Sequence, residues 1–155
     1  METAKYVSID EKALLPLADD IIKKQEKLFY DFEESTFHYV NEEKPDLVVD
    51  YVFILDAMNF CFWPVKPLGY KDLASLLKQQ LTNNPSLFKP KNLISLDFSQ
   101  FKNQIFNSID YGLMKERYQI IQDTAWTVLQ KFEGEFSNVV KTGQNSVVKL
   151  LEILT

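Results

Sequence analysis

A nearly unbroken apolar run over residues 47–55 most constrains how this chain of 155 residues can fold. A segment that is apolar on almost every side must be buried, either as a central helix or as an inner strand. The run follows Pro45, which suits the first position of a helix, and its length also favours a helix. We therefore predict a buried helix over 45–58. A buried strand is the competing interpretation, because β-branched and aromatic residues are frequent in the run.

Apolar residues at helical spacing predict helices in most of the remaining chain, so we expect an all-α fold, a compact multi-helix domain over residues 1–155. The expected helices cover 11–33 with Asp10 as N-cap, 70–82, a short segment capped by Ser95 or Asp97, 113–132 with a stop at Gly134, 135–141 and 146–154. Connections are expected at 34–44 and 63–69, and Pro90 is expected to keep the segment after it irregular.

The composition is that of a globular domain, with 46% hydrophobic and 14% aromatic residues. A net charge of −5 argues against binding along a phosphate backbone, so no polynucleotide partner is expected. The single cysteine, Cys61, excludes an intrachain disulfide and a cysteine-based zinc site. It fits a reducing compartment, and we predict the cytoplasm. No apolar stretch approaches the roughly 20 residues that span a bilayer, so no membrane partner is expected.

A block of polar and aromatic residues, 56–63, closes the apolar run. Asp56 supplies a carboxylate, Asn59 supplies an amide, and the aromatics are Phe60, Phe62 and Trp63. These are the groups with which a pocket holds a flat polar heterocycle. Asn59 could instead cap the helix, and each aromatic could fill the core. The block is therefore a candidate site, with core packing as its alternative.

Asp56 has two interpretations of its own. It could orient a substrate or stabilise developing positive charge, or it could be a buried acid bonded to a backbone amide or to a basic residue such as Arg117 or Lys71. His38, the single histidine, has no second histidine for a metal site, but it could donate a hydrogen bond to a substrate oxygen. Arg117 is the single arginine, and either a structural or a phosphate-binding role fits it.

Residues 50–63 resemble the block of the queuosine salvage proteins, the queuosine 5′-phosphate N-glycosylases, in which a hydrophobic run is followed by Asp, two residues and Asn-Phe-x-Phe-Trp. Weaker matches occur in the same order along the chain, at 6–10, 69–70, 116–121, 131–136 and 145–150. The resemblance covers essentially the whole sequence.

This resemblance implies an all-helical fold related to the helical DNA glycosylases. It implies hydrolysis of the N-glycosidic bond of queuosine 5′-monophosphate, which frees queuine for reinsertion into tRNA, without a metal or organic cofactor. The residues expected at the substrate are Asp56, Asn59, Phe60, Trp63 and His38.

Members of that family continue well past this length, and their second half carries a Phe-x-Asp-Tyr-Arg segment and a late Trp-Asp pair that this sequence lacks. The resemblance therefore implies that the chain corresponds to the N-terminal half. Asp56 is then a supporting carboxylate, and the main catalytic residue is not assigned in this chain. The alternative is a non-catalytic helical module that pairs with a second chain through the apolar helix 147–154.

Overall fold

A computed structural model describes residues 10–23, 36–63, 68–144 and 146–154, and every regular element in these ranges is a helix, which confirms the all-α prediction. The helices are α1 (Glu11–Lys23), α3 (Pro45–Met58), α4 (Tyr70–Asn83), α5 (Pro90–Ser95), α6 (Phe98–Phe106), α7 (Met114–Lys131), α8 (Phe136–Thr142) and α9 (Val147–Leu154). Within the described part of the chain, no helix has the length and apolar character needed to cross a bilayer. The chain divides into two compact units, residues 1–35 and 36–155.

The first unit contributes α1. Asp10 caps it as predicted, because the side chain accepts a hydrogen bond of 3.0 Å from the backbone N–H of Lys12. Pro16 lies inside this helix. The predicted continuation of this helix beyond Lys23 to residue 33 lies outside the described residues.

The apolar run forms α3, so the helix prediction is confirmed and the strand interpretation is excluded. Pro45 occupies the first turn, where its missing N–H has no intrahelical partner to lose. The buried face contains Asp50, Tyr51, Ile54, Leu55 and Met58. This helix packs against α4, α7 and α8, which explains why it is apolar over most of its circumference.

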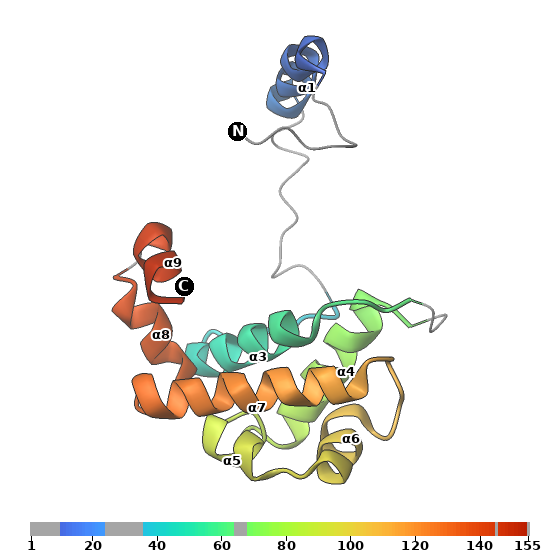
Figure 1. The fold of residues 1–155 in the computed structure, drawn as a ribbon, viewed down its shortest axis with the longest axis vertical. Helices are drawn as coiled ribbons and strands as arrows, with labels where there is room; N and C mark the ends of the chain where they lie inside the picture. The colour runs from blue at the N-terminus through green and yellow to red at the C-terminus, as the bar shows by residue number, and fades with distance from the viewer. Residues whose placement is uncertain (1–9, 24–35, 64–67, 145, 155) are drawn as a thin grey trace. The chain divides into compact units, whose positions relative to one another are not determined.

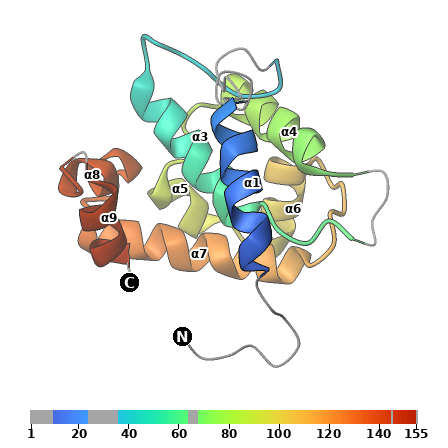
Figure 2. The same ribbon diagram turned by 90° about the horizontal axis from the view of Figure 1, so that it is seen from above.

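Helix α7 is the long element against which the second unit is built. It packs along α3 and also contacts α5 and α6, while α4 bridges α3 and α6. Figures 1 and 2 both show α6 near one end of α7, and α8 and α9 gathered at the other end. The fully buried side chains of this unit include Tyr51, Leu73, Leu77, Phe88, Phe101, Ile105, Phe106, Ala125 and Phe136.

Local signals place several of the helix ends. Asp97 caps α6 through a capping box, in which its carboxylate accepts from the Gln100 N–H at 2.7 Å and its own N–H donates to the Gln100 side chain at 2.9 Å. Gly134, with φ of +75°, follows α7 and donates its N–H to the Val128 carbonyl. The irregular segment predicted after Pro90 is wrong, because the proline begins α5 at a position where helices accept it.

Candidate functional site

The predicted block 56–63 begins in the last turn of α3 and continues beyond its C-terminus. Asp56 lies in that turn with an exposed side chain, and Asn59 is the C-cap, whose N–H donates to the Asp56 carbonyl at 3.3 Å. Phe60 is half-buried, and Trp63 is 78% exposed. The buried helix therefore delivers a carboxylate, an amide and an indole to the surface at one end.

Arg117 of α7 holds the backbone of this block in place. Its guanidinium is fully buried and donates to the carbonyls of Met58, Phe60 and Cys61, the last two at 2.5 and 3.2 Å. Its Nε donates to the Gly112 carbonyl at 3.0 Å. These bonds satisfy carbonyls at the end of α3, where a cation is also favoured by the helix dipole. Arg117 therefore has the structural role, and its partners are carbonyls rather than Asp56.

Two aromatics of the block pack on the same guanidinium. The Arg117 Cζ lies 4.4 Å from the ring centroid of Phe60 and 5.4 Å from that of Phe62. Such cation–π contacts strengthen when the cation is buried. Phe62 also meets the ring of Tyr111 edge-on at 6.4 Å. Trp63 is thus the most exposed aromatic of the block, whereas Phe60, predicted to face the substrate, packs its ring against Arg117.

His38 lies in a connection, as expected, but it is buried rather than solvated, with 2% of its side chain exposed. Its Nδ1 is 3.2 Å from the hydroxyl of Tyr51 on α3, and its Nε2 is 3.2 Å from the hydroxyl of Tyr70 at the start of α4. The Tyr51 hydroxyl donates to the Ala74 carbonyl at 3.2 Å. This imidazole is therefore positioned by both helices that flank it.

Electrostatic interaction links His38 and Asp56, two of the predicted site residues. Burial lowers the pKa of His38, the charge of Asp56 opposes that shift, and the charge of Lys78 adds to it. Partial burial of Asp56 raises the pKa of its carboxyl group, and the charge of His38 opposes this shift. The charge of each group thus affects the protonation of the other, and in this sense the two groups share one electrostatic environment.

Tyr51 and Tyr70 are the members of this environment that the sequence analysis did not assign to the site. Tyr51 lies within the apolar run 47–55 that was predicted to be buried, and it is indeed fully buried. A buried phenol needs a hydrogen-bond partner, and that requirement is the signal that marks Tyr51. Tyr70 appeared as part of a family match, but nothing in its spacing indicated contact with His38.

A second buried acid, Asp50, lies on α3. Its side chain is fully buried, and its Oδ2 lies 2.9 Å from Lys89 Nζ, which also reaches Glu135 Oε2 at 2.8 Å. Burial raises the pKa of Asp50, and Lys89 opposes the shift. The interaction considered for Asp56, a buried acid paired with a basic residue, therefore occurs at Asp50.

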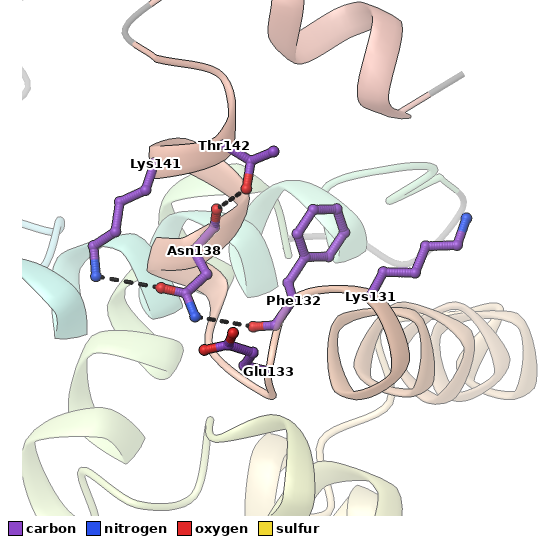
Figure 3. Close-up of a pocket in the computed structure, with 6 residues that line it drawn as sticks. All are labelled: Lys131, Phe132, Glu133, Asn138, Lys141 and Thr142. Carbon is purple, nitrogen blue, oxygen red and sulfur yellow. Dashed lines mark hydrogen bonds between the residues drawn. The ribbon is translucent and has the colours of Figure 1, made fainter.

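Two surface hollows lie away from these residues. One of about 210 Å³ is lined by Lys131, Phe132, Glu133, Asn138, Lys141 and Thr142, and one of about 350 Å³ by Asn84, Ser86, Leu87, Asn92, Ser95, Leu96, Gln100 and Gln104. In Figure 3 the ammonium groups of Lys131 and Lys141 point to opposite sides, and the Asn138 amide is held by the Phe132 carbonyl and by Lys141. The predicted residues line neither hollow.

Comparison with known proteins identifies the family. The family described as queuosine salvage protein matches residues 37–155. A protein of Dictyostelium discoideum named queuosine 5′-phosphate N-glycosylase/hydrolase is 28% identical over 98% of this chain and 50% of its own length. A protein of the same name from Sphaerobacter thermophilus is 25% identical over 100% of this chain and 50% of its own length. Another from Mus musculus is 25% identical over 77% of this chain and 40% of its own length. The chain thus spans about half the length of the curated relatives it matches, or less, and it belongs to the queuosine salvage protein family.

Proposed function

We propose that this chain supplies the base-binding part of a hydrolase that cleaves the N-glycosidic bond of queuosine 5′-monophosphate and releases queuine for tRNA queuosine salvage. The observation that carries the proposal is the electrostatic link between Asp56 and the buried His38, beside the exposed Asn59 and Trp63. The family and the names of its relatives support the substrate class. We place the reaction in the cytoplasm.

The chemistry of the reaction gives each group a role. Cleavage of an N-glycosidic bond builds positive charge on the ribose, and a nearby carboxylate stabilises that charge. Asp56 fits this supporting role. Trp63 offers a ring face for stacking the base, and the Asn59 amide offers both a donor and an acceptor to its edge. The ring of Phe60 borders the base, and its contact with Arg117 holds the block 56–63 in place.

No residue of this chain is assigned as the nucleophile or general base. The curated relatives are about twice as long as the matched region, and we place the main catalytic carboxylate in their other half. The chain on its own then binds the nucleotide or free queuine, and hydrolysis needs the rest of the family fold.

The test measures binding and hydrolysis separately. The purified chain is titrated with queuosine 5′-monophosphate by calorimetry, and the same mixture is analysed for free queuine by chromatography. We expect Asp56→Asn to weaken binding by about tenfold, since a hydrogen bond to a charged group contributes about 1.5–3 kcal/mol. Asp123→Asn, an exposed acid on α7, is the matched control and should bind like the wild type.

The outcomes separate three cases. Binding without release of queuine supports the proposal as stated. Release by the wild type but not by Asp56→Asn makes this chain a complete enzyme and Asp56 a member of its catalytic machinery. A folded wild-type chain that neither binds nor cleaves the nucleotide contradicts the proposal.

The second candidate function is a helical interaction module, and α9 provides the observation that favours it. Val147 and Val148 are 74% and 66% exposed on a strongly apolar helix that packs against α8. The proposed partner is a separate chain that corresponds to the other half of the relatives. Sedimentation of an equimolar mixture with that half of the Dictyostelium discoideum relative should show a complex that Val148→Glu abolishes and Lys115→Glu on α7 does not. Two species that sediment independently would contradict this pairing.

A further inference from the structure

Cys61, in the block 56–63, has a backbone conformation that residues other than glycine rarely adopt. Its φ is +43°, in the left-handed region, where the Cβ atom crowds the following carbonyl oxygen. Such a conformation persists only where the surrounding structure holds it. The Cys61 side chain is exposed, so burial of its thiol does not explain the conformation.

The peptide groups on both sides of Cys61 are held by one nitrogen of Arg117. Its Nη2 donates to the carbonyl of Phe60 at 2.5 Å and to that of Cys61 at 3.2 Å. Only the φ and ψ rotations of Cys61 separate these two carbonyls. Successive carbonyls of an extended segment point to opposite sides, so one nitrogen reaches both only when Cys61 has a helical conformation, right-handed or left-handed. Arg117 therefore restrains both torsion angles of Cys61.

The residues before and after Cys61 are restrained by the same guanidinium. The rings of Phe60 and Phe62 both pack on it, with centroids 4.4 and 5.4 Å from Cζ. Arg117 is itself fully buried, and its Nε donates to the Gly112 carbonyl at 3.0 Å. The support is thus fixed in the core, whereas Trp63, two residues beyond Cys61, is 78% exposed. The conformation of Cys61 therefore sets the direction in which the chain leaves this support towards Trp63.

We propose that Arg117 is a positioning residue that holds Cys61 in the left-handed conformation, and that this conformation presents Asn59 and Trp63 to the base. Arg117 acts through the backbone of the block and not by touching the nucleotide. The conformational step stands on the structure alone, whereas the effect on base binding rests on the proposed function. Strain held at a binding segment prepares that segment before its ligand arrives, so less ordering is needed on binding.

The conformational step is tested without any nucleotide. Because the chain contains a single cysteine, ¹⁵N-cysteine labelling gives one backbone amide signal, that of Cys61. A positive φ brings the amide proton close to the α-proton of the same residue, so a strong intraresidue nuclear Overhauser effect marks the left-handed conformation. We expect a strong effect in the wild type and a clearly weaker one in Arg117→Lys. Lys115→Arg, an exposed position on α7, is the control and should keep the strong effect.

Calorimetric titration with queuosine 5′-monophosphate tests the effect on base binding. A protein whose competent conformation is only partly populated binds with an affinity reduced by that fraction. We expect Arg117→Lys to raise Kd by about tenfold, the order set by the cost of a left-handed residue other than glycine. Adding Cys61→Gly to Arg117→Lys should recover part of that loss, because glycine adopts a positive φ without strain. A role of Arg117 in overall stability alone would not be repaired in this way.

Cys61→Val tests the same conformation with Arg117 in place, and it replaces Arg117→Lys if that variant does not fold. A β-branched residue strongly disfavours a positive φ, so we expect Kd to rise by about tenfold or more. Ser108→Val is the matched control, because Ser108 is exposed after α6 with a φ of +63°. It introduces the same strain outside the block and should leave Kd unchanged. Circular dichroism confirms that each variant is folded.

Three results would overturn the proposal. A weak intraresidue effect in the wild type removes the left-handed conformation, and a strong effect retained in folded Arg117→Lys removes the role of Arg117. A nucleotide affinity of Cys61→Val equal to that of the wild type removes the link to base binding. A folded wild type that binds no nucleotide contradicts the proposed function and that link together, while the spectrum of Cys61 still decides whether Arg117 holds it.

Discussion

At the scale of single residues, Arg117 stabilises the end of α3 with one side chain. Its guanidinium donates to three carbonyls of the segment after residue 57 and to that of Gly112. A lysine ammonium cannot reproduce this planar arrangement of donors. We predict that Arg117→Lys lowers the free energy of unfolding by about 2–4 kcal/mol, because buried carbonyls lose their partners.

Urea unfolding monitored by circular dichroism measures that loss. Lys115→Arg, the reverse exchange at an exposed position of the same helix, is the control and should change stability by less than about 0.5 kcal/mol. Equal unfolding midpoints for Arg117→Lys and the wild type would show that the carbonyls find other partners.

His38 makes stability depend on pH in a direction set by its burial. Its pKa in the folded chain lies below 6.5, the ordinary value, so the unfolded chain binds the proton more readily between the two values. The contribution of the neutral His38 side chain to the free energy of unfolding is fully present above pH 6.5. It is lost as the pH falls through the pKa of His38 in the folded chain. We predict that the free energy of unfolding falls on acidification below pH 6.5, and that His38→Gln reduces this fall. Denaturant titrations at several pH values measure both slopes, and identical slopes would contradict the prediction.

At the scale of elements, the ion pairs of Lys89 connect α3 to the segments that begin α5 and α8. Lys89 is 29% exposed, whereas Asp50 is fully buried and depends on it. Removing one partner leaves a buried charge uncompensated, which costs about 3–5 kcal/mol. We predict a loss of about 3 kcal/mol for Lys89→Met, at the low end because Lys89 is partly solvated.

Thermal and urea unfolding test this prediction against Lys91→Met, which removes an exposed lysine from α5 itself. Adding Asp50→Asn to Lys89→Met should recover part of the lost stability, because the uncompensated carboxylate is then gone. A double variant that is less stable than Lys89→Met would show that Asp50 has a stabilising role apart from the pair.

The elements themselves were largely predictable, because their ends depend on neighbours in sequence. Pro45 and Asp97 specify helix starts through contacts within a few residues, and Gly134 specifies a stop in the same way. Pro90 was misjudged, although the same rule that explains Pro45 explains it. A proline alone is compatible with either the end or the start of a helix, and only the residues that follow it distinguish the two cases.

At the scale of the whole molecule, the candidate site was predictable only in part. The block 56–63 was recognised because its residues are consecutive. The environment of His38 was not, because its hydrogen bonds join residues 13 and 32 positions apart in the sequence. Periodicity predicts which face of a helix is buried but not which residue of another segment meets it. The relation to the helical DNA glycosylases stays a prediction of the resemblance.

Binding of the proposed substrate should stabilise the folded chain as a whole. At a nucleotide concentration about 100-fold above Kd, the expected gain is about 2.7 kcal/mol, which a thermal-shift experiment detects. Guanosine 5′-monophosphate is the control, and we expect it to stabilise much less. Equal stabilisation by the two nucleotides would indicate a general nucleotide site rather than one for queuosine.

The exposure of Trp63 has a practical consequence for observing the protein. The chain's two tryptophans, Trp63 and Trp126, are 78% and 55% exposed, so their emission reports hydrated indoles rather than the interior. Unfolding then changes the intrinsic fluorescence little, whereas a base that stacks on Trp63 quenches it. In a Trp126→Phe protein, the tryptophan fluorescence excited at the red edge of indole absorption comes from Trp63 alone. The intensity of that fluorescence would then report directly whether the proposed nucleotide is bound.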